Sequence, residues 1–402
     1  MALQNSGAIS LDDIHVEAGG TTGTSASIND SDIRGLIDKS DGATMAFNEW
    51  YGAQNIGYVE GTGGTTSESG NFRFHTFTSS GTFDITATAF NGPSNTIDYV
   101  VIAGGGAGGT GRGDRSRSHS QYAESMAGGG GAGGYISGTF TATTGAKSVT
   151  IGAGGASTGG ANYTGVGAQT NGSQSSLAGE TTSTGGGSGA YYAGNPGGPG
   201  IRATSGGSGG GGSGRGRYLI PGVTSEGTPD KNDGISGQGH DGAVGNPSGP
   251  DLAASYYTSG GGGGGAGADA PSSGTQYAGR NVVMQGGTGS SGGDAAGSTV
   301  RAGGGGAGSA IFQLNHVAYG TKYPWGGQGG DDTATSNAGG AGRGAQSYHY
   351  TQGYSGNVGN YDTAATSGDA NTGGGGGGGG GKQASGAGGS GVVIVRYQYQ
   401  GG

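Results

Sequence analysis

The chain has 402 residues, with 110 glycines, 9 prolines, no cysteine and a formal net charge of −9. Without cysteine, the fold cannot depend on disulfides or on thiolate-bound metals. The acidic balance argues against a nucleic-acid partner, because phosphate binding needs clustered Lys and Arg. No stretch approaches eighteen consecutive apolar residues, so we expect no membrane insertion, and the first twenty residues lack the basic and apolar regions of a secretory signal.

The first 60 residues are the part of the chain with the least glycine. Residues 10–17 alternate apolar and polar positions, and a short helix is expected over residues 30–38, capped by Asn29 or Ser31. Aromatic side chains then gather between Met45 and Tyr51. Because so short a segment buries little apolar area, we expect it to dock on a partner, the alternative being an arm folded on its own chain.

The order of residues in this segment resembles the opening of tail-associated structural proteins of bacteriophages, particularly cyanophages. The resemblance lies in residues 7–11, in Glu17 followed by Gly19-Gly20, and in residues 45–53. It implies that residues 1–60 attach the protein to a phage tail or fibre-shaft protein. The residues implied for virion attachment are Leu11, Ile14, Phe47, Trp50 and Tyr51.

From residue 61 the pattern changes to that of β-strands. Apolar residues alternate or nearly alternate over residues 72–77 and 83–89, and the apolar run 97–103 leads directly into Gly104. Further strands are expected at residues 135–141 and 147–151. We expect residues 61–103 to form a small β platform that is closed by residues 392–402, with Val392–Tyr399 pairing near Tyr99–Ala103.

Residues 104–391 are dominated by glycine tracts. Such tracts bury no side chains and lose much backbone entropy on ordering, so only lateral hydrogen bonds between their backbones can hold them together. Polyglycine II geometry has three residues per turn and no internal hydrogen bonds, which suits this arrangement. The predicted fold is therefore mainly β and irregular, with a bundle of packed polyglycine II helices and long surface loops. The alternative, low-complexity disorder, is indicated by glycine content alone. The tracts are at residues 104–109, 128–134, 206–214, 260–267, 303–308, 373–381 and 386–391.

The middle and end of the chain resemble the glycine-rich domain of phage tail fibres. The resemblance lies in residues 99–106, 128–135, 148–155 and 389–397. A related architecture is the polyglycine II sandwich of tail-fibre tip adhesins, which implies a virion protein that binds a host surface receptor through its loops. Those adhesins are usually separate proteins, whereas this domain shares its chain with an anchoring segment. The oligomeric state is therefore open, with a homotrimer among the options.

Long linkers connect the later tracts, at residues 268–285, 309–325 and 345–372, and we expect them to share one end of the bundle. For the last strand to return to the platform, residues 373–391 must form one excursion out and back. The linkers combine tyrosine with Ser, Gly and Asn, as antibody paratopes do, and tyrosine also suits sugar rings. The alternative is that these side chains pack over the bundle. The candidate receptor-binding residues are Tyr277, Tyr319, Tyr323, Trp325, Tyr348, His349, Tyr350, Tyr354 and Tyr361.

Signals for catalysis are weak. The pattern Gly-x-Gly-x-x-Gly recurs through composition alone, and Gly381-Lys382 is followed by Gln383 where a phosphate loop needs Ser or Thr. The histidines are scattered, and paired carboxylates typical of a glycosidase are missing. We therefore expect a non-enzymatic adhesin for a glycan or an outer-membrane protein, without cofactor or metal. Two alternatives are a self-assembling filament protein and a glycan depolymerase tailspike.

Overall fold

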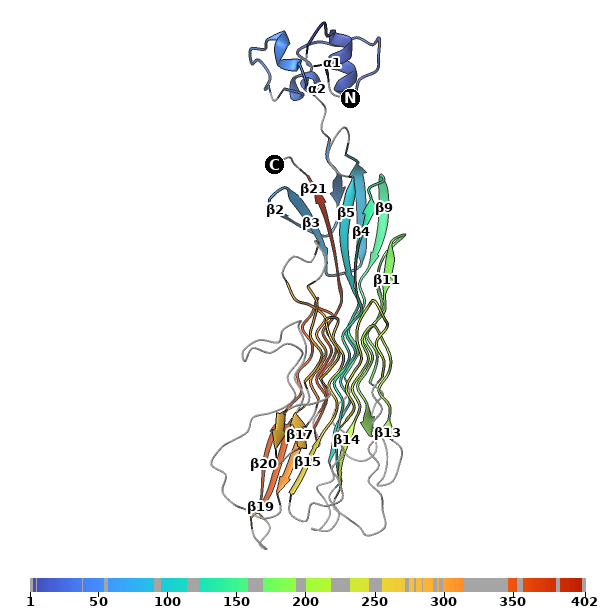
Figure 1. Ribbon diagram of the computed structural model, residues 1–402, viewed down its shortest axis with the longest axis vertical. Helices are drawn as coiled ribbons and strands as arrows, with labels where there is room; N and C mark the ends of the chain where they lie inside the picture. The colour runs from blue at the N-terminus through green and yellow to red at the C-terminus, as the bar shows by residue number, and fades with distance from the viewer. Residues whose placement is uncertain are drawn as a thin grey trace.

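The protein is elongated, with its parts stacked along one axis (Figure 1). A small helical module at the N-terminus is followed by a β-sandwich, then by a bundle of extended segments, and finally by short strands at the far end. The computed structural model describes residues 3–4, 6–37, 39–53, 57–89, 95–113, 123–157, 169–192, 200–217, 232–245, 255–271, 275–277, 280–283, 285–291, 295, 299–307, 309–313, 346–352, 357–380 and 384–399.

The N-terminal module contains helix α1 (Leu11–Glu17), helix α2 (Ser31–Gly35) and a 3-10 helix, η1 (Phe47–Trp50). Although residues 10–17 alternate as a strand would, a capping box starts a helix there. The Asp13 N–H donates to Ser10 Oγ at 3.0 Å, and the Ser10 N–H donates to the Asp13 carboxylate at 2.8 Å. The predicted helix over 30–38 is shorter, and Asp30 is its N-cap in place of Asn29 or Ser31.

This module has its own small core. Leu3, Ile14, Ile33 and Trp50 are buried together, and Trp50 Nε1 donates to the Ile33 carbonyl at 3.1 Å. Arg34 is buried beside this core. Arg34 Nε donates to the Ser40 carbonyl at 3.0 Å. Nη1 donates to Asn29 Oδ1 and Nη2 donates to the Ala43 carbonyl, both at 2.9 Å. The segment therefore forms a small apolar core of its own.

We expect Arg34→Met to destabilise the N-terminal module by about 2–4 kcal/mol, because it removes the charged hydrogen bonds that join α2 to Asn29, Ser40 and Ala43. Unfolding can be followed by Trp50 fluorescence in a Trp325→Phe background, since the chain has two tryptophans. Lys39→Met is the matched control. Lys39 pairs with Glu49 at 2.8 Å on the surface, where such a pair contributes less than about 1 kcal/mol. Equal effects of the two changes would contradict the structural role given to Arg34.

The β-sandwich consists of two antiparallel five-stranded sheets. The first has the order β2 (Thr65–Ser69), β3 (Phe72–Phe77), β21 (Val392–Gln398), β5 (Thr96–Ile102) and β8 (Tyr135–Thr141). The second has the order β1 (Glu60–Thr62), β4 (Gly81–Ala87), β9 (Gly145–Thr150), β10 (Ser175–Leu177) and β11 (Thr181–Ser183).

Side chains from both sheets meet in one apolar core, which includes Phe83 of β4, Val101 of β5 and Val395 of β21. Strand β21 lies between β3 and β5, and Val393 is paired with Val101. This confirms the predicted pairing of Val392–Tyr399 near Tyr99–Ala103. Strands β8 to β11 come from within residues 104–391, so the sandwich takes more of the chain than the platform expected from 61–103 and 392–402.

The bundle is built around residues 127–134, which we call the central tract. Along this tract, amides three residues apart donate to the same neighbouring segment, which is the repeat of polyglycine II. Its N–H groups donate to three segments, and its carbonyl groups accept from three others, at 2.8–3.0 Å. The acceptor segments are 184–190, 261–264 and 373–379, and the donor segments are 103–109 and 208–211, with Gly305 as the third. The central tract is thus surrounded by hydrogen-bonded backbone.

Glycine is required in the bundle because neighbouring backbones approach so closely. A Cβ built on Gly106 or Gly130 would lie 2.1 Å from a backbone oxygen of the next tract. Neither glycine has a positive φ, so other residues could adopt the same backbone conformation. The close approach of the neighbouring backbone, and not the φ angle, is therefore what requires glycine at these positions. Alanine therefore occurs where a methyl group has room, as at Ala107 and Ala132, which are fully buried.

Gly130→Ala is expected to destabilise the protein by at least about 3 kcal/mol, because backbone rather than a flexible side chain must move to admit the methyl group. Ala132→Gly, in the same tract, removes a methyl group and should cost only about 1 kcal/mol. Thermal or denaturant unfolding of the purified chain measures both changes. Similar losses for the two variants would contradict the close-approach argument.

The far end of the bundle carries short strands (Figure 1). A three-stranded sheet has the order β14 (Gly214–Arg217), β7 (Ala123–Met126) and β6 (Arg112–Gly113), and β12 (Tyr191–Tyr192) pairs with β13 (Gly200–Ile201). A four-stranded sheet has the order β15 (Ser255–Ser259), β18 (Ser309–Gln313), β19 (Gln346–Gln352) and β20 (Asn357–Thr363). Strand β16 (Thr275–Tyr277) pairs with β17 (Arg280–Val283).

The strands within the three long linkers share this end, as predicted for the linkers, although loops were expected in their place. The third linker does not lie wholly at this end, because residues 364–372 run along the bundle toward the sandwich, where the Ala302 N–H donates to the Thr372 carbonyl at 2.8 Å.

Residues 373–391 run out and back, also as predicted. The Gly386 N–H donates to the Gly377 carbonyl at 2.8 Å, and the Gly389 N–H donates to the Gly374 carbonyl at 2.7 Å. The two halves of this excursion are therefore antiparallel neighbours, which returns the chain to β21.

Candidate functional site

The four-stranded sheet at the far end aligns aromatic positions across its strands. Residues directly opposite each other on neighbouring strands belong to the same face of a sheet. The register therefore places four residues in one row, which we call the tyrosine row: Tyr257, Ile311, Tyr348 and Tyr361. At about 4.8 Å between strands, the row spans about 14 Å. Tyr350, two positions along β19, belongs to the same face.

The other face of this sheet has a different composition. Its central row consists of Tyr256, Phe312, His349 and Asn360. His349 therefore belongs to the opposite face of the sheet from Tyr348 and Tyr350, because successive residues of a strand belong to opposite faces. The run Tyr348-His349-Tyr350 is consequently divided between two surfaces and does not act as one cluster.

The structure brings together only part of the predicted receptor-binding set. Tyr348, His349, Tyr350 and Tyr361 lie on β19 and β20, whereas Tyr277 ends β16, whose partner β17 is close to β15 and β18. The remaining candidates, Tyr319, Tyr323, Trp325 and Tyr354, lie outside the described residues.

Sequence reasoning missed Tyr257 and Ile311 as members of the row. The signal for β19 and β20 was present, since the segments 346–352 and 357–363 flank a short stretch containing glycine, which is typical of a hairpin. No comparable signal joins residue 257 to residue 348, because strand pairing between distant segments is decided by the whole fold.

The predicted virion-attachment residues fall into two groups. Ile14 and Trp50 are fully buried in the core of the N-terminal module, so they support its fold and do not contact a partner directly, which corrects that prediction. Phe47 and Tyr51 are 46% and 39% exposed, and Leu11 is half-buried. Phe47 and Tyr51 therefore present apolar surface at the end of the molecule farthest from the tyrosine row.

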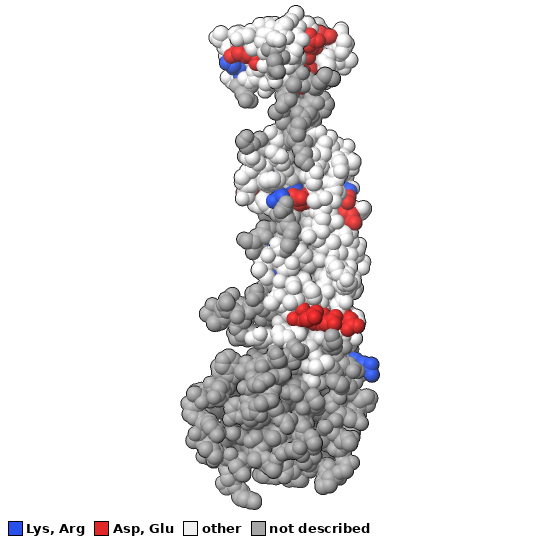
Figure 2. Space-filling model, viewed as in Figure 1, with Lys and Arg blue, Asp and Glu red and all other residues white. Residues whose placement is uncertain are grey.

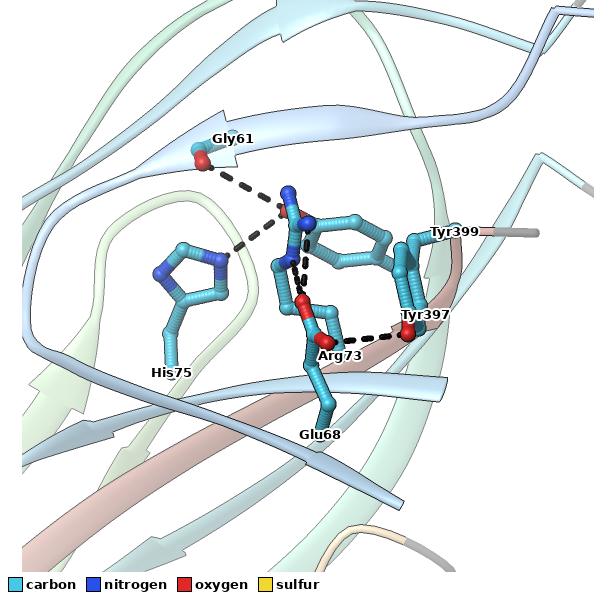
Figure 3. A network of polar contacts seen from close by, with 6 residues as sticks. All are labelled: Gly61, Glu68, Arg73, His75, Tyr397 and Tyr399. Atoms are coloured by element: carbon cyan, nitrogen blue, oxygen red, sulfur yellow. Dashed lines mark hydrogen bonds and ion pairs between the residues drawn. The ribbon is translucent and has the colours of Figure 1, made fainter. Parts of the chain in front are cut away.

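A polar network inside the sandwich is a second candidate site (Figure 3). His75 on β3 is fully buried, with Nδ1 at 2.6 Å from the Gly63 carbonyl and Nε2 at 3.0 Å from the Tyr397 hydroxyl. Next to it, Arg73 donates to Glu68 at 2.9 Å, and the Tyr399 hydroxyl donates to Glu68 at 2.9 Å.

This network holds the sandwich together. Burial lowers the pKa of His75, the bond to the Gly63 carbonyl opposes that shift, and the positive charge of Arg73 adds to it. The neutral ring therefore donates from Nδ1 to Gly63 and accepts at Nε2 from Tyr397. With both nitrogens engaged and the ring packed against Phe83, His75 has no free position for a substrate.

Among the described residues, no group of three or more His, Asp or Glu residues is arranged to hold a metal ion. None of the described helices is long and apolar enough to cross a membrane.

A family described as a glycine-rich domain matches residues 315–398, which include β19, β20, the excursion at 373–391 and β21. The match agrees with the glycine-rich character of this region. No curated protein matches the chain.

We expect the sandwich to lose stability as the pH falls below about 6.5, the ordinary pKa of histidine. The pKa of His75 is lower in the folded state, so the unfolded chain binds the proton more strongly, and acid favours unfolding. His75→Gln should flatten the dependence of the free energy of unfolding on pH below about 6.5, in the range above the titration of the carboxyl groups. The pKa of Glu68 is also lowered, mainly by its hydrogen bond to Arg73. Protonation of Glu68 therefore affects stability only below about pH 4.5, outside the range in which His75 acts. An unchanged profile in the variant would contradict this assignment.

Proposed function

We propose that the protein is a non-enzymatic attachment protein of a phage tail or tail fibre, which binds a receptor on the host cell surface. The observation that carries this proposal is the tyrosine row, which lies at the end of the molecule farthest from the N-terminal module. A row about 14 Å long that contains three tyrosines suits a flat, extended ligand.

The chemistry of the row supports a glycan or an outer-membrane protein as receptor. Tyrosine combines an apolar ring with a hydroxyl group and has few rotatable bonds, so it contributes a large contact area at low entropic cost. The same face of the sheet includes Ser255, Gln313 and Gln346, which can donate and accept hydrogen bonds. Aromatic faces surrounded by such groups are typical of adaptable recognition surfaces.

The construction of the molecule supports a division of labour between its two ends. The N-terminal module folds around its own core and exposes Phe47 and Tyr51, which would contact a tail or fibre-shaft protein. The hydrogen-bonded bundle and the sandwich separate this module from the strands at the far end. Such a protein would be part of the virion and would act outside the host cell.

The double variant Tyr348→Ser/Tyr361→Ser is expected to reduce binding of the fluorescently labelled protein to susceptible bacteria at least about tenfold, because two adjacent aromatic positions of the row are lost. Binding is measured by flow cytometry across a panel of bacterial strains. Tyr51→Ser makes the same chemical change at the opposite end and should leave cell binding unchanged.

Equal loss of binding in both variants would contradict a tip located on this sheet. Absence of binding to every strain, combined with growth of open-ended filaments as the protein concentration rises, would favour a self-assembling structural protein. Release of short glycans from bound cells would favour a depolymerase.

A further inference from the structure

Four extended segments form one side of the bundle, and we call them the outer layer. Backbone hydrogen bonds of 2.8–2.9 Å join each segment to the next, from an N–H group of one to a carbonyl group of the other. These bonds connect Ser173 with Ala153, Gly388 with Gly155, and Gly368 with Ala387. In their order across the layer, the segments are residues 170–174, 152–156, 386–391 and 366–371.

The inner side of the outer layer lies against the rest of the bundle. Gly105, in the tract 103–109, donates its N–H to the Gly389 carbonyl at 2.9 Å, and the Gly389 N–H donates to the Gly374 carbonyl at 2.7 Å. The central tract has hydrogen-bonded segments on all sides, whereas Ala153 and Ala156 of the outer layer are exposed. The outer layer is therefore a boundary at which the polyglycine lattice stops.

Glycine and the other residues occupy different positions within the outer layer. A Cβ built on any glycine of the four segments would lie 1.9–2.3 Å from a neighbouring backbone oxygen. Every other residue of these segments is exposed or half-buried. Ala153 and Ala156 in one segment, and Ser367 and Ala370 in another, are exposed pairs three residues apart, which is the repeat of polyglycine II. The side chains thus lie where no neighbouring tract is packed.

Without these side chains, the exposed side of the layer would be able to bind more chain. Its segments are already ordered, so hydrogen bonds to a second copy would form without the entropic cost of ordering them. An identical layer on another molecule offers matching donors and acceptors, as the free edge of a β-sheet does. A methyl group prevents this approach, because packed tracts leave only 1.9–2.3 Å between a Cβ position and the next backbone oxygen.

Charge repulsion does not supply this protection. Asp369 is the only Asp, Glu, Lys or Arg in the four segments. In the view of Figure 2, most of the described surface of the bundle is uncharged. The exclusion of a second copy from the outer layer must therefore be steric.

We propose that the side chains on the exposed side of the outer layer end the lateral growth of the polyglycine lattice, and so prevent a second copy of the chain from adding to it. The contact that they exclude is a symmetric one between the outer layers of two molecules. This inference concerns the bundle alone and does not depend on the proposed function.

The variant Ala153→Gly/Ala156→Gly/Ala387→Gly tests the proposal, because it removes the methyl groups from two adjacent segments of the outer layer. Analytical ultracentrifugation of the full-length protein over a series of concentrations measures its average mass. The mass of the variant should reach at least about twice that of the wild type, since two copies are the smallest assembly, and it should fall again on dilution.

The matched control is Ala153→Ser/Ala156→Ser/Ala387→Ser, which keeps a Cβ at all three positions and should sediment as the wild type does. Equal masses of the glycine and serine variants at every concentration would overturn the proposal. Wild-type protein that associates as strongly as the glycine variant would overturn it too. Thermal unfolding identifies a temperature at which all the proteins are folded, and Ala153→Gly/Ala156→Gly decides the outcome if the triple glycine variant does not fold.

Discussion

Lateral hydrogen bonding between glycine backbones is the interaction on which the rest of the molecule depends. A net contribution of about 1 kcal/mol for each hydrogen bond is comparable to the backbone entropy lost on ordering one residue, about 1–2 kcal/mol. An isolated pair of tracts would therefore not remain associated. The bundle gains its stability from closure around the central tract, where donors and acceptors are engaged on all sides, and from its attachment to an apolar sandwich.

The attachment explains an unusual feature of β5 and β21. Both strands are nearly continuous apolar runs, although the sheet is antiparallel and such strands commonly alternate. Val101 and Val393 face the interior of the sandwich, whereas Val100 and Ile394 belong to a second cluster that includes Ala132 of the central tract. Because both faces of these strands are covered, the sheet joins the hydrophobic core to the bundle.

The sequence predicted the features that depend on local composition and period. Glycine tracts indicated a hydrogen-bonded bundle, and the apolar runs at 97–103 and 392–399 indicated paired strands. The sequence does not indicate helix α1 clearly, because residues 10–17 alternate with period 2 and the capping box that starts the helix involves only two side chains, Ser10 and Asp13. The strands at the far end cannot be told from loops by composition, since Tyr, Ser and Gly are common in both.

The candidate site could be predicted only in part for the same reason. Composition drew attention to Tyr348 and Tyr361, but their alignment with Tyr257 depends on the pairing of β15, β18 and β19. Burial could not be read from residue type either, as Trp50 and Phe47 are close in sequence but only Phe47 is exposed.

The position of β21 in the middle of the first sheet has a consequence for biosynthesis. Asp98 and Arg396 form an ion pair although they are 298 residues apart, so the ribosome completes the glycine tracts before the strand that closes the sandwich emerges. A prematurely terminated chain would leave β3 and β5 with bare edges and the interior side of Val101 uncovered. Truncated products would thus be recognisable to proteases and chaperones, and only chains translated through β21 would accumulate as finished molecules.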